Sequence, residues 1–215
     1  MNYPEFDLIS HASPRLRKVF EASAKTRTLQ KGEVLFSQGD SGDCLFILSS
    51  GELLLSVLAD DGRRLALDVL IPGAVFGEIA LFDPGVRTAT VTAKKNSAVT
   101  YIKHSALIEA LVSERELAGD LFLLMGKRMR SMSIQLADHA FLPLSQLLAR
   151  KLLYLSPDEC RLEMSRSELA EYVGATREGV TKILLKWQHE ELIDMGRGWI
   201  MILNTQGLRV KGGLE

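Results

Sequence analysis

Glycine divides the first third of the chain into short pieces, which limits what this part can fold into. Between and after the glycines lie short runs with strand character, at residues 34–36, 45–48, 53–55, 65–67, 90–92 and 99–101. Turn pairs such as Gly39-Asp40 and Asp61-Gly62 separate several of these runs. Many short strands at this spacing predict an all-β barrel or jelly roll. Residues 13–25, which precede the strands, predict a lead-in helix.

The pattern changes after Lys103. Residues 105–140 contain no proline and few glycines. Apolar side chains recur there in steps of three and four residues, at Leu121, Met125, Met129, Met132 and Leu136. This spacing predicts a long amphipathic helix with a narrow apolar stripe. Such a stripe needs a partner, and a second copy of the chain is the simplest one; packing against the chain's own barrel is the alternative.

After Pro143 the sequence predicts three helices and a hairpin. The first helix is expected at 144–155, and Ser165 and Glu168 form a capping box that opens the second at 168–173. Thr176 is the N-cap of the third helix, at 177–189. Two short helices with a tight turn, followed by a hairpin around Gly196-Arg197-Gly198, predict a winged helix–turn–helix.

The fold class predicted from these patterns is α+β, in three parts. An N-terminal β-roll with its lead-in helix takes residues 1–104. A long dimerisation helix takes residues 105–140, and a winged helix–turn–helix domain takes residues 141–215.

The third predicted helix of the winged domain carries the residues that we expect to face DNA. Arg177, Glu178 and Thr181 lie in its first turns, where a recognition helix meets base edges. Lys182 and Lys186 follow, Arg197 at the wing tip is expected on phosphate, and Ser165 and Thr176 cap the two helices. The alternative is an ordinary solvated helix face, because residues 141–215 hold equal numbers of acidic and basic side chains.

Two opposite charges lie in the mostly apolar stretch 76–91. Glu78 and Arg87 are both costly to bury unpaired. A small anion that carries a ribose accounts for both: the Arg87 fork and the Thr88 hydroxyl bind a phosphate, and Glu78 accepts from a sugar hydroxyl. Backbone amides around Gly77, Ile79 and Ala80 add donors. A direct Glu78–Arg87 ion pair is the alternative, and the segment alone does not separate the two.

The same stretch resembles a known motif. Phe76-Gly77-Glu78-Ile79-Ala80-Leu81 and Arg87-Thr88-Ala89-Thr90-Val91 are similar to the phosphate-binding cassette of cyclic-nucleotide-binding domains. Residues 31–36, 39–43 and 71–73 resemble other hallmarks of that β-roll, a double-stranded jelly roll, and residues 165–184 resemble the helix–turn–helix of the CRP/FNR superfamily of transcription regulators. The order of β-roll, long helix and winged helix is that of this superfamily.

The resemblance implies roles for individual residues. Glu78 would bind the ribose hydroxyl, and Arg87 and Thr88 the cyclic phosphate, beside Phe76, Gly77, Ile79, Ala80 and Ala89. Met132 and Ser133 on the long helix match the place where relatives contact adenine, although Met132 lacks the hydroxyl found there. Arg177, Glu178 and Lys182 would read bases. Cyclic AMP is the favoured ligand and cyclic GMP the alternative, because a Thr88 hydroxyl can meet the guanine amino group.

The resemblance also implies a mechanism and partners. Ligand binding in the β-roll would reposition the dimer helices and the two recognition helices on a near-palindromic operator. The expected partners are double-stranded DNA, a second copy of the chain through the long helix, and RNA polymerase. The alternative is a constitutive or protein-regulated DNA-binding regulator whose β-roll binds no nucleotide. A further alternative is a nucleotide-regulated protein partner with no DNA role.

Several function classes are not expected. The chain shows no nucleophile elbow, zinc motif, Walker loop or dinucleotide fingerprint, so we do not expect an enzyme. Cys44 and Cys160 lack metal spacing, and neither a metal, a haem nor an iron–sulfur cluster is expected. The net charge of −1 excludes bulk electrostatic binding to nucleic acid, but not a local basic patch. With no signal peptide or spanning segment evident, the expected location is the cytoplasm, away from membranes.

Overall fold

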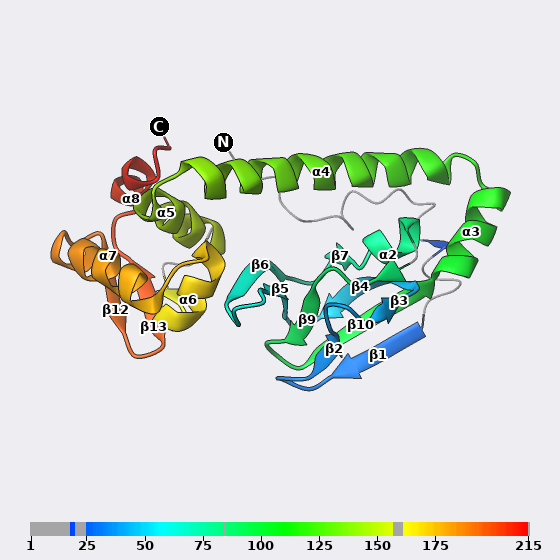
Figure 1. Cartoon of the computed structure of the whole chain (residues 1–215), viewed down its shortest axis with the longest axis horizontal. Coiled ribbons are helices and arrows are strands. Elements are labelled where there is room, and N and C mark those ends of the chain that lie inside the picture. The colour runs from blue at the N-terminus through cyan, green and yellow to red at the C-terminus, as the bar shows by residue number, and fades with distance from the viewer. Residues whose placement is uncertain (1–17, 20–24, 84, 157–160, 215) are drawn as a thin grey trace. The chain divides into compact units, whose positions relative to one another are not determined.

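The structure is a computed structural model that describes residues 18–19, 25–83, 85–156 and 161–214 (Figure 1). These residues divide into two compact units, one up to residue 58 and over 67–130, the other over 59–66 and 131–214. The predicted lead-in helix over 13–25 lies largely outside the described residues. Lys18 and Val19 are helical, whereas Lys25 already begins a strand.

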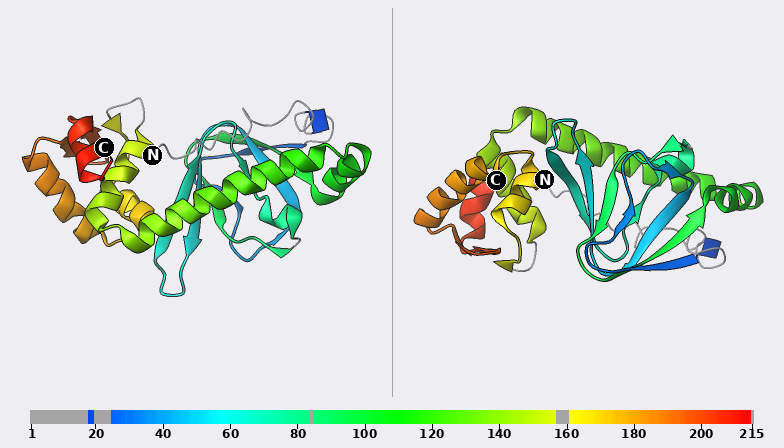
Figure 2. Two further views of the ribbon diagram at one scale, coloured as in Figure 1. Left: turned by 90° about the horizontal axis from the view of Figure 1, so that it is seen from above. Right: turned by 60° about the horizontal axis from the view of Figure 1, so that its bottom comes forward.

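The strands form a β-roll of two four-stranded antiparallel sheets, as the jelly-roll prediction required. One sheet has the order β1-β10-β4-β7: β1 (Lys25–Leu29), β10 (Ser97–Lys103), β4 (Cys44–Ser50) and β7 (Val75–Phe76). The other has the order β2-β9-β5-β6: β2 (Val34–Phe36), β9 (Thr90–Ala93), β5 (Leu53–Leu58) and β6 (Arg64–Leu70). A small third sheet pairs β3 (Ser41–Gly42) with β8 (Gly85–Val86). Figure 2 shows these strands from two further directions.

Alternation along the strands fills the roll with side chains. Ala66, Asp68 and Leu70 of β6 share one face and are buried, because successive strand residues point to opposite faces. The apolar core of the roll includes Leu29, Leu48, Leu53, Phe76, Val91 and Val99. Asp68 is the polar member of this buried face of β6, and its Oδ1 accepts a hydrogen bond from the Val69 amide at 2.8 Å.

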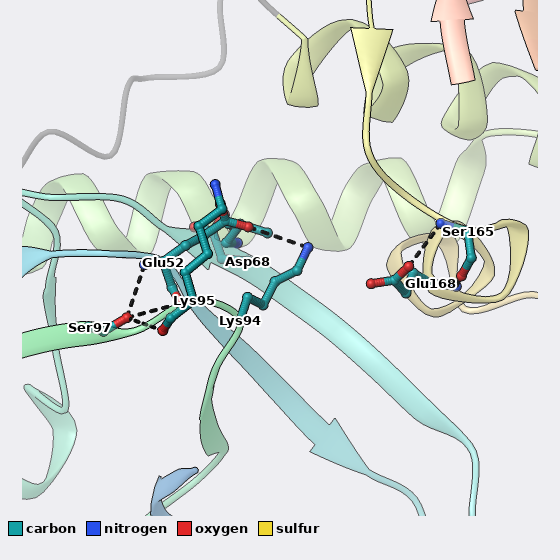
Figure 3. Close-up of polar contacts among 8 residues, drawn as sticks. Glu52, Asp68, Lys94, Lys95, Ser97, Ser165 and Glu168 are labelled. Carbon is teal, nitrogen blue, oxygen red and sulfur yellow. Dashed lines mark hydrogen bonds and ion pairs between the residues drawn. The ribbon is translucent and has the colours of Figure 1, made fainter. Parts of the chain in front are cut away.

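A polar cluster lies where β4 turns into β5 (Figure 3). The Glu52 carboxylate lies 2.7 Å from Lys95 Nζ and 3.4 Å from Lys94 Nζ. Ser97 Oγ donates to the Lys95 carbonyl at 2.7 Å and accepts from the Glu52 amide at 3.1 Å. Gly51 adopts φ +92°, and Ser97 occupies the place where a side chain on Gly51 would lie. Lys94 and Lys95 therefore pair with Glu52 and stabilise the turn between β4 and β5.

The expected single helix over 105–140 is two helices, α3 (His104–Ser113) and α4 (Leu117–Phe141). At the break, Glu114 leaves helical geometry with φ −129° and ψ 86°. Leu107 of α3 and Leu117 and Leu121 of α4 are buried in one apolar cluster. A straight helix would hold Leu107 and Leu117 about 15 Å apart along its axis. The turn between the helices lets both side chains reach this cluster.

The exposed apolar stripe of α4 differs from the predicted one at its start. Leu121 is 2% exposed and belongs to the chain's own core, whereas Phe122 is 74% exposed. The stripe that faces solvent runs through Phe122, Met129, Met132 and Leu136. These residues follow one another at steps of seven, three and four positions, which places their side chains on one face of the helix.

The C-terminal part contains the predicted helices and hairpin. They are α5 (Leu144–Leu155), α6 (Arg166–Val173), α7 (Arg177–His189), β12 (Ile193–Gly196) and β13 (Trp199–Ile202). The sequence patterns did not predict β11 (Arg161–Leu162), which pairs with β13, or the terminal α8 (Thr205–Lys211). Leu148 and Leu152 of α5, Leu169 of α6, and Leu184 and Trp187 of α7 are almost fully buried. These side chains hold the winged helix–turn–helix together.

Candidate functional site

Arg87 is buried inside the β-roll, with only 6% of the residue exposed. Its Nη1 donates to the carbonyl oxygens of Cys44 at 3.0 Å and Gly77 at 3.2 Å. The guanidinium carbon lies 4.4 Å from the centroid of the Phe36 ring and 5.3 Å from that of Phe46. Two carbonyls and two aromatic faces thus set the direction in which the remaining donors point.

One buried donor of Arg87 is unmatched within the described part of the chain. Its Nε has no hydrogen-bond partner among the described residues, and none of their carboxylates is bonded to the side chain. Burial lowers the pKa of Arg87, while Asp43, Glu78 and Asp40 act in the opposite direction. An arginine nevertheless stays protonated in proteins. A buried cationic donor without an acceptor is costly, and a bound anion would remove that cost.

Two glycines make room for the guanidinium. A Cβ on Gly42 would overlap the Nε and Cζ atoms of Arg87, and a Cβ on Gly77 would lie 2.8 Å from its Nη1. Gly77 also adopts φ +79°, which disfavours any side chain. Both the strand residue Gly42 and Gly77, which follows β7, therefore need to be glycine.

The Gly42→Ala variant tests whether Arg87 must hold this position. We expect it to weaken binding of an anionic ligand by roughly ten- to a hundredfold, because the displaced guanidinium loses at least one charge-assisted hydrogen bond. Titration calorimetry with cyclic AMP measures the effect. Gly85→Ala is the matched control: Gly85 pairs with Gly42, and its added Cβ would meet only the Asp83 carbonyl at 3.7 Å. Equal affinities of the two variants would contradict the prediction.

Glu78 pairs with a residue that the sequence analysis did not single out. Its Oε1 lies 3.1 Å from Nε of Arg128, and both side chains are largely buried. The alternative of a direct Glu78–Arg87 ion pair is therefore wrong. The signal that could have revealed Arg128 is its spacing: it follows the buried Leu121 by seven residues, and so lies on the same face of α4. A charge on that face needs a buried partner.

The other predicted ligand residues differ in exposure. Phe76, Ala80 and Ala89 are buried, whereas Ile79 is 38% exposed and Thr88 is exposed. Ile79 and Ala80 begin the short helix α2 (Ile79–Phe82), directly after Glu78. Met132 and Ser133 are exposed on the part of α4 that belongs to the other compact unit, so their contact with a base stays a prediction.

Local capping fixes the helix–turn–helix. The Ser165 hydroxyl accepts from the Glu168 amide at 3.2 Å, and the Glu168 carboxylate accepts from the Ser165 amide at 2.8 Å, which completes the predicted capping box (Figure 3). Gly174 ends α6 in the left-handed conformation at φ +61°. The Thr176 hydroxyl then accepts from the Gly179 amide at 3.2 Å and starts α7. These caps commit the Ser165 and Thr176 hydroxyls to the fold.

The outer face of α7 is exposed to solvent and carries charged side chains. Arg177, Glu178, Lys182 and Lys186 are exposed, and the opposite face is buried. Within the described ranges, neither Arg177 nor Lys182 forms an ion pair, whereas Lys186 Nζ lies 3.9 Å from Glu190. Thr181 is half-buried and donates its hydroxyl proton to the Arg177 carbonyl at 2.7 Å, which leaves it only as an acceptor. Arg197 is exposed in the turn between β12 and β13.

The geometry agrees with comparisons to known proteins. Residues 26–114 match the family model for the cyclic nucleotide-binding domain, and residues 146–210 match that for the Crp-like helix-turn-helix domain. A CRP-like cAMP-activated global transcriptional regulator of Mycobacterium tuberculosis is 30% identical over 194 residues, which cover 84% of each chain. The chain belongs to the CRP/FNR family of transcription regulators.

Solved structures of CRP/FNR regulators have the same fold. A regulator from Thermus thermophilus has a TM-score of 0.71 at 25% identity, with 88% of this chain and 98% of that chain covered. The c-di-GMP-responsive global regulator CLP of Xanthomonas campestris has a TM-score of 0.77 at 23% identity, with 86% and 97% covered. The helix–turn–helix family model and the Mycobacterium tuberculosis relative both belong to transcription regulators, in agreement with the expectation that the chain is not an enzyme.

The family assignment carries some general properties with it. CRP/FNR regulators bind DNA through the helix–turn–helix and are dimers. Among the described helices, none combines the length and apolarity needed to cross a membrane.

Cys44 is buried, and its Sγ donates a hydrogen bond to Oδ1 of Asp43 at 3.1 Å. Burial and this hydrogen bond raise the pKa of the Cys44 thiol to about 11. The other cysteine, Cys160, lies outside the described residues.

Proposed function

We propose that this CRP/FNR regulator binds a cyclic nucleotide, with cyclic AMP favoured, and that the nucleotide controls its affinity for DNA. The observation that carries this proposal is the buried Arg87 guanidinium, whose Nε has no acceptor among the described residues. The Phe36 and Phe46 rings and two carbonyls hold it, and a second buried charge, Glu78, follows Gly77 in the same cassette. Cyclic GMP is the alternative ligand, because Thr88 is exposed and can offer a hydroxyl to a guanine amino group.

In this proposal, different residues bind different parts of the ligand. Arg87 and Thr88 bind the cyclic phosphate, and Glu78 accepts from the ribose 2′-hydroxyl. Arg128 holds Glu78 in place and belongs to α4, so the ribose end of the ligand is linked to this helix by one ion pair. Met132 and Ser133, one turn further along α4, would meet the base.

The DNA-reading half of the proposal uses α7 and the wing. Arg177 pairs with guanine, Glu178 accepts from cytosine, and Lys182 reaches guanine or phosphate. Lys186 and Arg197 bind phosphates, and Thr181 can accept from a base amino group. Dimerisation through the exposed stripe of α4 would place two α7 helices in successive major grooves, about 34 Å apart. RNA polymerase is a further proposed partner, and the cytoplasm the proposed location.

A nucleotide panel tests the proposal. Cyclic AMP at about a hundred times its Kd should stabilise the folded chain by about 2.7 kcal/mol. For a chain of this size that corresponds to a rise in Tm of roughly 5–10 °C. Cyclic GMP tests the alternative ligand, and linear 5′-AMP is the matched control because it lacks the cyclic phosphate. A fluorescence-anisotropy titration of DNA with and without each nucleotide then measures control of DNA binding.

A second candidate function rests on the Glu78–Arg128 pair. This contact already satisfies the Glu78 carboxylate, which is compatible with a roll that holds no nucleotide. The chain would then be a constitutive or protein-regulated DNA-binding regulator. Unchanged Tm and unchanged DNA affinity with both cyclic nucleotides would favour this candidate over the first.

A further inference from the structure

Two residues join the long helix to the winged domain. At the end of α4, the Leu142 amide donates a hydrogen bond to the Asp138 carbonyl at 3.0 Å, and α5 begins after Pro143. Pro143 adopts φ −57° and ψ 148°, which is extended rather than helical. A connection of this length lets α5 rotate relative to α4 unless another contact prevents it.

One side chain crosses this connection. Arg150 lies in the second turn of α5, and its Nη1 is 3.0 Å from Oδ1 of Asp138, in the last turns of α4. The side chains are 19% and 10% exposed, so solvent screens the pair only weakly. This ion pair ties the end of one helix to the body of the next across Leu142 and Pro143.

The same guanidinium also binds the end of α8. Arg150 Nε donates to the Gly212 carbonyl at 2.7 Å. Gly212 packs closely on Arg150, since a Cβ on this glycine would lie 3.3 Å from the arginine Cγ. Gly213 follows in the left-handed conformation at φ +64° and turns the chain there. One planar fork therefore joins α4, α5 and the C-terminal end of α8, a geometry that lysine cannot reproduce.

We propose that Arg150 is a positioning residue that fixes the winged helix–turn–helix relative to the end of α4. Helix α5 packs against α6, α7 and α8, so whatever holds α5 also holds the recognition helix. With Asp138 and Gly212 engaged, a displacement of α4 passes to α7 as a movement of one body. Without the guanidinium, the two residues between α4 and α5 would absorb that displacement. The positioning role needs no ligand; its effect on regulation rests on the proposed function.

Distances between spin labels on α4 and α7 test the positioning role directly. Labels are placed at the exposed positions Arg130→Cys and Leu185→Cys in the full chain. Cys160→Ser removes one native thiol, and Cys44 is buried with a raised thiol pKa. Labelled chains are diluted with unlabelled ones so that only distances within a chain contribute. Arg150→Met keeps an unbranched apolar stem but removes the guanidinium, with its charge and its donors.

We expect Arg150→Met to widen the label–label distance distribution at least about twofold, because rotation at the connection is no longer restricted. Arg209→Met removes the same charge from α8, where no ion pair involves it among the described residues, and should leave the width as in the wild type. An unchanged width in a folded Arg150→Met protein overturns the proposal, and so does equal widening in Arg209→Met. If Arg150→Met does not fold, Asp138→Ala, which removes the acceptor of Arg150 Nη1, decides by the same criterion.

DNA binding supplies the functional readout. Arg150→Met should lower the ratio of DNA affinities with and without cyclic AMP to about a tenth of its wild-type value, while nucleotide affinity by calorimetry changes less than about threefold. Loss of nucleotide affinity instead would place Arg150 in the ligand site and overturn the proposal. If nucleotide does not change the DNA affinity of the wild-type chain, the proposed function is contradicted but the positioning role of Arg150 is not. The spin-label distances then test that role by themselves.

Discussion

Replacing Arg87 with leucine is expected to reduce cyclic-nucleotide affinity by more than about 100-fold. The side chain is buried, and its unmatched Nε together with the rest of the fork would bind the phosphate. Each charge-assisted hydrogen bond to a buried anion is worth about 1.5–3 kcal/mol, and tenfold in affinity corresponds to about 1.4 kcal/mol. Losing two such bonds therefore removes nearly all measurable binding in a calorimetric titration with cyclic AMP.

The control must separate lost binding from lost folding. Arg87→Leu also leaves the Cys44 and Gly77 carbonyls without their donor, so the Tm of the variant has to be measured beside its affinity. Arg87→Lys keeps the charge but not the planar guanidinium, so its nucleotide affinity should lie between those of the wild type and Arg87→Leu. Arg27→Leu removes an exposed arginine that pairs with Glu33, and should bind as the wild type does. Undiminished affinity in a folded Arg87→Leu protein would show that the phosphate assignment is wrong.

Replacing Arg177 with alanine is expected to cost about 1–3 kcal/mol in DNA affinity and to relax the preference at one base position. Arg177 is the first residue of α7, is exposed and has no ion pair within the described residues, so its guanidinium is available for guanine O6 and N7. The Thr176 cap depends on the hydroxyl of Thr176 and not on Arg177, so the helix should start at the same place in the variant. Selection from a random DNA pool, followed by affinity titration, measures both effects.

Lys186 provides the contrast for Arg177. It lies further along α7, 3.9 Å from Glu190, where a phosphate contact is expected. Lys186→Ala should weaken binding about equally for all sequences and reduce the slope of affinity against salt by about one. If Arg177→Ala selects the same DNA sequence as the wild type, Arg177 does not read a base.

The β-strands show how far the local pattern reaches. The run 53–55, which begins β5 (Leu53–Leu58), was predictable because its apolar residues lie between turn signals. Strand β1, by contrast, has four exposed residues out of five and no alternation that marks it as a strand. It exists because it pairs with β10, more than sixty residues later, from Lys25 with Tyr101 to Leu29 with Ser97. A pairing partner at that separation leaves no mark within the segment itself.

The break between α3 and α4 has the same origin. Nothing local in residues 105–140 ends a helix, since no proline lies there. The break occurs because Leu107, Leu117 and Leu121 must enter one core with Leu45, Val75 and Ile102 of the β-roll. That requirement also moved the start of the exposed stripe from Leu121 to Phe122.

Sequence alone determined the parts that short-range chemistry controls: the capping box at Ser165, the Thr176 cap and the charged outer face of α7. Each of these depends on residues a few positions apart, whose spacing is visible in the chain. The cassette that contains Glu78 and Arg87 was indicated by its resemblance to cyclic-nucleotide-binding domains, because the segment by itself left a direct ion pair open. Tertiary structure decided the partners of the buried charges: Arg128 for Glu78, two carbonyls and two aromatic rings for Arg87, and Asp138 with Gly212 for Arg150. The cost of burying a charge shows that it needs a partner, but only the packing of distant elements brings a particular partner within hydrogen-bond distance.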